Sequence, residues 1–443
     1  MKNWYEIYKT TIVKTISRED VAKTIRIAAQ KFVEAKKQAL RQIKNLEELL
    51  RRAKEIRRDA INNLESLIKE VKEHVEAVGG TFYLAKTAGD ANRKVLEICE
   101  KHEAKTIVKS KSTTTEEISL NEFLEEHDVE VVETDLGEYI IQQLKEKPSH
   151  FVVPAVHISK EKIAELFSKL LGEKIPPEIT AITLAARKIL RRKFITADIG
   201  ISGANAIAAD TGTIFLITNE GNGRFVTNAP PIHICITGIE KINPTIEDAF
   251  TITRILPIYA TGQIMTSYVS LITGPSRTAD IEFTPTIGVH GPKELHLILL
   301  DNGRTKMLKD PSFKDALQCI RCGSCLNVCP VYQRLGGTYG YKYIGAIGTI
   351  FTAFMHGIEK AAGPAYACTL CSKCVEACPL GLDIPKMMTR LRNRLQKMGY
   401  TTPPHQKVLA NIFQTGNPFG EPKETRTTWM KPRPSGKSDI IKV

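Results

Sequence analysis

The chain has 443 residues, 42% of them hydrophobic, and its formal net charge at pH 7 is +13. This length allows two or three domains, and the apolar fraction can support a full hydrophobic core. The polar N-terminus excludes a signal peptide, and no apolar run reaches transmembrane length, so we predict a cytoplasmic protein with reduced thiols.

Residues 1–78 are predicted to form a helical region, because apolar residues recur there at helical spacing until Gly79 and Gly80. Strands then alternate with helices, which is typical of βαβ units and a mostly parallel sheet. We expect this α/β domain to span residues 79–305 and to become rich in short strands from Phe194 onwards. The predicted strands are 81–85, 106–109, 129–133, 151–155, 206–209, 214–218, 233–237 and 295–300. The predicted helices are 91–101, 137–145, 160–171 and 247–256. A further helix is predicted to start with a capping box at Thr114.

Two cysteine runs near the C-terminus follow the pattern C-x2-C-x2-C-x3-C-P, which is the ferredoxin-type run for a [4Fe–4S] cluster. Three closely spaced thiolates can hold one cluster. The fourth lies a helical turn further on, and the proline after it, Pro330 or Pro379, keeps it from joining the same cluster. In two-cluster proteins the fourth cysteine therefore binds the other cluster. We predict one cluster on Cys319, Cys322, Cys325 and Cys378, and a second on Cys368, Cys371, Cys374 and Cys329.

The domain that carries these runs is expected over residues 306–400. Zinc or disulfides fit the runs less well, because zinc sites favour separated C-x2-C pairs and disulfides need an oxidising compartment. The other cysteines, Cys99 and Cys235, stand among apolar residues and are expected to be buried core thiols. Residues 401–443 are predicted to be a basic tail that is poorly ordered after Pro418.

Several loops of the predicted α/β domain are candidate anion sites. The loop 109–112 carries two lysines between a strand and a helix, where carboxylates or phosphates are attracted. The loops 200–205 and 219–224 are rich in glycine, and the loop 274–280 places a cation and a carboxylate among small residues. Each loop alone is more simply explained as a turn with solvated charges.

Taken together, these segments resemble the lactate-utilisation protein B family, the iron–sulfur subunit of a lactate oxidase, over roughly residues 15–400. The resemblance implies a LUD α/β domain, similar to sugar-phosphate isomerases and formyltetrahydrofolate cyclo-ligase, followed by an all-α double-cluster ferredoxin domain. It also implies that the protein takes part in the oxidation of L-lactate to pyruvate. In this reaction it would work with two further subunits, one that is cluster-bearing or rich in cysteine and one that consists of a LUD domain only. The matching segments are KSKSTTTEE (109–117), ETDLGEYIIQ (133–142), PSHFVVPAVH (148–157), DIGISGANAIAADTG (198–212), NEGNGRFVTNAPP (219–231), GPSRTADIE (274–282) and GVHGPKELHLILLDNG (288–303).

A hydroxyacid substrate would need cations for its carboxylate and a base for its hydroxyl proton. Two arginines can bind the carboxylate through bidentate hydrogen bonds, and a histidine can serve as the base, although a lone histidine is more often structural. The candidate catalytic residues are Arg224, Arg277, His233 and His290, and the candidate substrate-binding residues are Lys109, Lys111, Asn205, Glu220 and Asp280.

The sequence contains no G-x-G-x-x-G fingerprint for FAD or NAD, so any flavin is expected in a partner. Three functions stay open: a lactate or 2-hydroxyacid oxidoreductase subunit, an electron-relay and docking subunit for a separate flavin dehydrogenase, and a redox-sensing module that binds a nucleotide or CoA. The expected partners are other lactate-oxidase subunits or that dehydrogenase, with a small carboxylate ligand. The basic charge favours an acidic partner or a peripheral membrane contact over nucleic acid, for which no motif is present.

Overall fold

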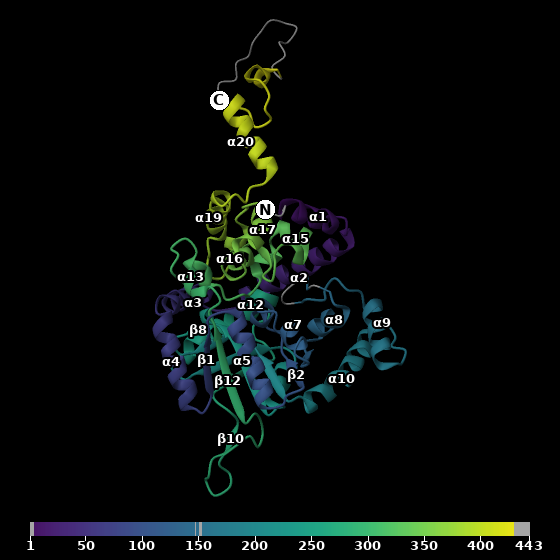
Figure 1. Ribbon diagram of the computed structural model, residues 1–443, viewed down its shortest axis with the longest axis vertical. Coiled ribbons are helices and arrows are strands. Elements are labelled where there is room, and N and C mark those ends of the chain that lie inside the picture. Colours follow the sequence, from purple (N-terminus) through teal and green to yellow (C-terminus); the bar gives the residue numbers. More distant parts are fainter. Residues whose placement is uncertain (1–3, 147, 150–152, 429–443) are drawn as a thin grey trace. The chain divides into compact units, whose positions relative to one another are not determined.

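The computed structural model describes residues 4–146, 148–149 and 153–428 (Figure 1). The chain divides into two units, Met1–Leu391 and Arg392–Val443. The first unit combines N-terminal helices, an α/β domain and a helical cysteine-bearing domain, so the predicted fold class is confirmed. Within the described part of the chain, no helix combines the length and the apolar character that crossing a membrane requires.

A six-stranded parallel sheet forms the centre of the α/β domain, in the order β1-β12-β7-β4-β2-β3. Its central strands are short and apolar on both faces, as expected for a parallel sheet that is covered on both sides. The strands are β1 (Thr81–Ala85), β2 (Thr106–Lys109), β3 (Glu130–Glu133), β4 (Ile199–Ser202), β7 (Ile232–Gly238) and β12 (Glu294–Leu300).

Alternate residues of the strands enter separate cores on the two faces of the sheet. Ile234 of β7 packs in the core under α5 and α7, whereas Cys235 packs in the core under α4. On this second side, beside β2 and β3, α8 to α11 contribute to a further core around Phe167. The helices are α5 (Ala88–Lys101), α6 (Thr113–Glu117), α7 (Leu120–Glu125), α8 (Leu136–Leu144), α9 (Lys160–Leu171), α10 (Ile179–Thr196) and α11 (Asn222–Asn228).

A smaller sheet in the order β8-β5-β6-β9 packs with helix α12 in the same domain. Between β9 and β12 the chain forms the hairpin β10–β11, which projects from the lower end of the domain in Figure 1. These elements are β5 (Ala206–Ala208), β6 (Thr213–Thr218), β8 (Ile242–Asn243), α12 (Ile246–Thr261), β9 (Tyr268–Ile272), β10 (Arg277–Thr278) and β11 (Thr286–Ile287), with a 3-10 turn η1 at Ile239–Lys241.

Four helices precede the first strand: α1 (Trp4–Ile16), α2 (Glu19–Gln42), α3 (Leu46–Asn62) and α4 (Leu64–Ala77). Helix α2 packs against α12 of the α/β domain and against α14 and α15 of the cysteine-bearing domain. Its Ile25 is buried with Tyr332 and Tyr339, and its Lys36 Nζ donates a hydrogen bond to Ser324 Oγ at 2.8 Å. A single N-terminal helix therefore contacts both domains.

The cysteine-bearing domain is helical, as the resemblance implied. Its helices are α13 (Arg304–Leu308), α14 (Ser324–Asn327), α15 (Pro330–Leu335), α16 (Gly345–Met355), α17 (Ile358–Ala367), α18 (Lys373–Ala377) and α19 (Ile384–Lys397), with 3-10 turns η2 (Lys314–Gln318) and η3 (Gly336–Thr338).

The second unit contains helix α20 (Pro403–Thr415) and the 3-10 turn η4 (Lys423–Thr427). Thr402 caps α20 by accepting a hydrogen bond from the backbone N–H of His405 at 3.3 Å. Part of the predicted basic tail is therefore helical. The expectation of poor order after Pro418 falls partly on residues 429–443, which lie outside the described residues.

Two predicted elements differ from the structure. Of the predicted strand 151–155, residues 151 and 152 lie outside the described residues, and Val153 to Ala155 lie in a bend and turns. The helix expected at Thr114 begins at Thr113, because Ser112 is the residue whose hydroxyl accepts the capping bond, from the N–H of Thr115. Helix α10 was not predicted, although its buried residues recur at helical spacing: Ile182, Ala185, Ala186, Leu190 and Phe194.

We expect Phe167→Ala in α9 to lower the free energy of unfolding by about 3–5 kcal/mol, because the side chain is fully buried and its loss leaves a cavity. Leu170→Ala in the same helix is the matched control, since Leu170 is 43% exposed. The control should change stability by no more than about 0.5 kcal/mol. Urea unfolding followed by circular dichroism measures both, and equal losses would contradict this packing of α9.

Candidate functional site

A polar cavity of about 300 Å³ lies at the carboxyl edge of the parallel sheet. Strands β2 and β4 are neighbours in the sheet. From β2 the next strand of this sheet, β3, lies on the side away from β4, and from β4 the next strand, β7, lies on the side away from β2. In open α/β sheets, ligands bind outside the carboxyl ends of the strands at such a switch point. The position of this cavity, which we call the switch-point cavity, therefore marks it as the candidate ligand site of the domain.

The loops after β2 and β4 form one wall of the switch-point cavity. They approach closely at Gly203, where a Cβ atom would lie 2.7 Å from Ser112 Oγ, so only glycine fits without a shift. Asn205 Oδ1 accepts a hydrogen bond from the Ile217 N–H at 2.9 Å, which leaves the amide nitrogen as the free donor of that side chain. Ser110 is 4% exposed, and its hydroxyl has no hydrogen-bond partner among the described residues.

The opposite wall brings together segments that are distant in sequence. It includes Lys241, after β7, and Ile320 and Arg321 from the loop between the first two cysteines of the first run. Lys241 is 9% exposed, and its ammonium group makes no hydrogen bond or ion pair with any described residue. Burial, and then the charge of Arg321, lower the pKa of Lys241 to about 8, so the side chain still carries a proton at pH 7.

The eight cysteines of the two runs gather into two groups beside this wall. Cys319, Cys322, Cys325 and Cys378 line one cavity, and Cys329, Cys368, Cys371 and Cys374 line another. In each group the fourth thiol comes from the other run, which is the grouping that the spacing predicted. Among the described residues, no set of three Cys, His, Asp or Glu side chains is arranged to hold a single metal ion.

Apolar side chains enclose both cysteine cavities and separate them by a thin wall. Leu326, Ile347 and Ile384 line both cavities, and Cys325 touches both. The thiols are the available ligands in these surroundings, so the residues present fit two compact groups that are each bound by four thiolates. The close spacing of the cavities suits transfer of electrons between such groups.

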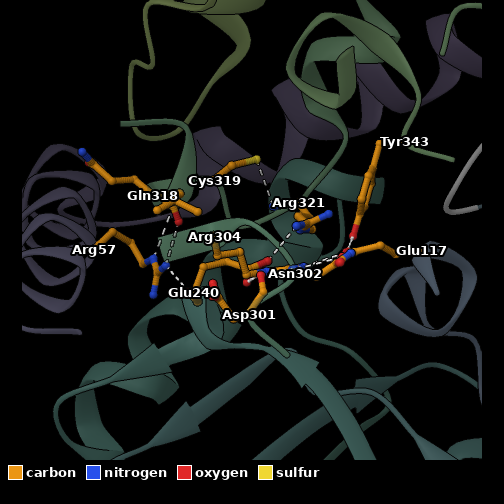
Figure 2. Close-up of polar contacts among 11 residues, drawn as sticks. Arg57, Glu117, Glu240, Asp301, Asn302, Arg304, Gln318, Cys319, Arg321 and Tyr343 are labelled. Atoms are coloured by element: carbon orange, nitrogen blue, oxygen red, sulfur yellow. Dashed lines mark hydrogen bonds and ion pairs between the residues drawn. The ribbon is translucent and has the colours of Figure 1, made fainter. Parts of the chain in front are cut away.

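A network of buried charges lies beneath the first cysteine cavity (Figure 2). Arg304, at the start of α13, is fully buried and forms a bidentate pair with Glu117, with N···O distances of 2.8 and 3.0 Å. The Arg304 Nε also donates a hydrogen bond to Glu240. Asn302 Nδ2 donates to Glu117 at 2.6 Å, and the Tyr343 hydroxyl donates to the same carboxylate. The α/β domain thus supplies two carboxylates to one arginine.

The same network holds the loop between Cys319 and Cys322. Arg321 Nη2 donates to Glu240 Oε1 at 2.6 Å, and its guanidinium lies over the rings of Tyr343 and Phe351, 4.4 and 4.3 Å from their centroids. Its backbone N–H points at Cys319 Sγ at 3.4 Å. Burial alone would raise the pKa of Glu240, but Arg304 and Arg321 outweigh it and hold that pKa well below its ordinary value. The carboxylate therefore stays charged.

Helix α3 completes the network through Arg57. Its guanidinium donates to the carbonyl oxygens of Ile242 at 3.0 Å and Leu317 at 3.1 Å, and also to the carbonyl of Glu240. It therefore joins the N-terminal helices, the α/β domain and the segment before Cys319, as Figure 2 shows.

Three of the predicted substrate-binding residues line the switch-point cavity: Lys111, Asn205 and Glu220. Lys109 does not line it. Its ammonium is fully buried, lies 2.6 Å from a carboxylate oxygen of Glu133 and donates to Thr115 at 2.9 Å, so it is already paired inside the protein. Lys111 remains at the cavity and pairs with Glu138 at 3.1 Å.

The four predicted catalytic residues are not brought together, and none of them lines the switch-point cavity. His233 is buried at the amino end of β7 and borders a different cavity of about 190 Å³. Its Nε2 shares a hydrogen bond of 2.7 Å with Ser202 Oγ, and burial lowers its pKa to about 3, which keeps the ring neutral.

The remaining predicted residues are exposed, with Arg224 in helix α11, Arg277 in strand β10, and Asp280 and His290 in loops. Arg224 stacks over the ring of Tyr268, 5.0 Å from its centroid, and Arg277 donates to the backbone carbonyl of Val78. Asp280 accepts a hydrogen bond from Thr278 Oγ1 at 2.8 Å, and His290 is exposed.

Sequence reasoning missed Lys241, Arg321 and the buried network. No local pattern marks them, because their partners lie far along the chain: Arg304 pairs with Glu117 across 187 positions. One signal was present. Arg321 stands inside a cysteine run, where a bulky cation has no role in the spacing of the thiols.

Comparisons with known protein families match both halves of the chain. The LUD domain matches residues 68–300, and the 4Fe-4S dicluster domain matches residues 315–382. The first match contains the strands and most of the loops of the switch-point cavity, and the second contains Ile320, Arg321 and all eight clustered cysteines. The second match identifies the cysteine-bearing domain as an iron–sulfur domain.

Curated relatives align along most of this chain and most of their own. Lactate utilization protein B of Bacillus subtilis is 37% identical over 94% of this chain and 85% of its own length. The protein of that name from Shouchella clausii is 41% identical over 82% of this chain and 75% of its own. The uncharacterized electron transport protein YkgF of Escherichia coli is 36% identical over 91% and 83%.

We expect Arg304→Met to destabilise the protein by about 3–5 kcal/mol, because it leaves the buried carboxylate of Glu117 without its counter-ion and Glu240 with Arg321 alone. Arg51→Met, which removes an exposed arginine paired with Glu48 and Glu55, is the control and should have little effect. Chemical unfolding at pH 7 measures both variants. Unchanged stability in Arg304→Met would show that the network does not fix the two domains to each other.

Proposed function

The chain belongs to the LUD-domain family of lactate utilization protein B, and from this premise we propose that it is the iron–sulfur electron-transfer subunit of an oxidoreductase that oxidises lactate, or a related 2-hydroxyacid, to pyruvate. The observation that supports the proposal best is the gathering of eight cysteines into two four-thiol cavities with a shared wall. A subunit that only bound the substrate would not need this arrangement.

Cys319, Cys322, Cys325 and Cys378 would hold one [4Fe–4S] cluster, and Cys329, Cys368, Cys371 and Cys374 the other. Two such clusters supply one-electron transfer, so the two electrons of a 2-hydroxyacid oxidation can be passed on singly. The side chains of Leu326, Ile347 and Ile384 would exclude water from the path between the two sites.

Oxidation of lactate to pyruvate releases two electrons and two protons, and the first acceptor has to take a hydride or its equivalent. The sequence carries no dinucleotide fingerprint, so we assign that acceptor to a partner subunit. The same observation favours a second candidate function, in which the chain is the relay and docking subunit of a separate flavin dehydrogenase.

Anaerobically purified protein should contain about eight irons, and each cluster should depend on a cysteine from the other run. Cys378→Ser should damage the cluster of the first run, whereas Cys374→Ser, four residues away, should damage the other cluster. Iron analysis and EPR of the reduced variants distinguish them. Four irons, stoichiometric zinc, or loss of the same cluster in both variants would contradict the assignment.

The isolated chain should oxidise L- or D-lactate slowly or not at all, and its clusters should become reduced by lactate only after the co-purified partner is added. The reason is that the sequence carries no dinucleotide fingerprint for a hydride-accepting cofactor. Anaerobic absorption bleaching with each lactate enantiomer measures the reduction. Reduction of the isolated chain at the rate of the full assembly would contradict the need for a partner.

A further inference from the structure

We propose that the switch-point cavity binds a small monocarboxylate, with Lys241 as the cation that receives the carboxylate, directly beside the loop between Cys319 and Cys322. The inference rests on the proposed function and adds the place and the chemical class of the ligand. It also assigns a role to two residues, Lys241 and Arg321, for which the sequence provided none.

Three cations line the cavity, Lys111, Lys241 and Arg321, together with the carboxyl groups of Asp135 and Glu220. Lys111 is paired with Glu138 at 3.1 Å, and Arg321 is paired with Glu240 at 2.6 Å. Lys241 is nine-tenths buried and lacks any hydrogen bond or ion pair with the residues that the structure describes. The neighbouring Glu240 attracts Lys241, but its carboxylate oxygens are bonded to Arg304 and Arg321. A buried charge without a direct ion pair is costly, so an anionic ligand supplies the missing partner. One unpaired cation suits a carboxylate better than a phosphate dianion.

Neutral groups on the wall opposite Lys241 suit an oxygen on the carbon next to the carboxylate. The buried hydroxyl of Ser110 has no partner among the described residues, and the amide nitrogen of Asn205 is a donor. Together they can bind either a hydroxyl or a keto oxygen. The volume of about 300 Å³ is at the lower limit for small-molecule pockets, which favours a short acid over a nucleotide.

Arg321 and Ile320 line both the switch-point cavity and the first cysteine cavity. A carboxylate bound at Lys241 would place a negative charge close to the cluster held by Cys319. Adding an electron to that cluster then becomes less favourable, so its reduction potential should fall when the ligand binds. By thermodynamic reciprocity, the oxidised protein should bind the ligand more tightly than the reduced protein.

The test uses the full-length protein with its clusters, under anaerobic conditions. Calorimetry with pyruvate, L-lactate and inorganic phosphate should show binding of the carboxylates and weaker binding of phosphate. Lys241→Met should weaken pyruvate binding about ten- to hundred-fold, as expected for the loss of a charge-assisted hydrogen bond. The control Lys69→Met removes an exposed lysine of α4 and should leave the affinity unchanged.

Redox titration followed by EPR gives a second measure. Pyruvate should lower the midpoint potential of one cluster in the wild type and in Lys69→Met, but not in Lys241→Met. If Lys241→Met fails to fold, Asn205→Asp tests the opposite wall of the same cavity, because a carboxylate there should repel the ligand.

Three results would overturn the inference: full affinity in Lys241→Met, tighter binding of phosphate than of pyruvate, or loss of affinity in Arg277→Ala instead. Such a result together with eight irons and lactate-dependent reduction in the full assembly would leave the proposed function intact. Lys241-dependent binding without lactate-dependent reduction would reject the proposed function and keep the site.

Discussion

The pairing of Arg304 with Glu117 and Glu240 is the interaction on which the arrangement of the first unit depends. Charges withdrawn from water are stable only when each has its partners, so every member of the network fixes the position of the others. Glu240 passes this constraint to Arg321, whose guanidinium packs on the rings of Tyr343 and Phe351. The loop between Cys319 and Cys322 is thereby held against the carboxyl edge of the sheet.

That position brings two kinds of chemistry together. A parallel sheet offers its binding crevice at the carboxyl ends of its strands, where backbone groups and loop side chains converge. The iron–sulfur domain is packed against the same edge, so that Ile320 and Arg321 are walls of the crevice as well as parts of the cysteine loop. The crevice and the first group of thiols therefore share the residues Ile320 and Arg321 as a common wall.

The sequence predicted those features that depend on local spacing. Alternating strands and helices indicated the parallel sheet, and the two cysteine runs indicated the grouping of the thiols, because both patterns repeat over a few residues. Long-range pairing was not predictable. Lys109 was expected to be free for an anion, but Glu133 lies on the adjacent strand β3 and neutralises it. Lys241 follows a buried strand and had no local feature that marked it as part of a cavity.

Helix α2 has a consequence for how the protein is made. Its Lys36 is hydrogen-bonded to Ser324, which lies 288 positions further along the chain, and its Ile25 packs with Tyr332 and Tyr339. The apolar face of α2 therefore leaves the ribosome long before the helices that cover it. The compartment for the clusters cannot close until nearly the whole chain has been synthesised, so insertion of iron and sulfide is a late event that follows translation of the α/β domain. The cysteine runs lie near the C-terminus, but the compartment around them also needs helix α2 from the N-terminal part of the chain.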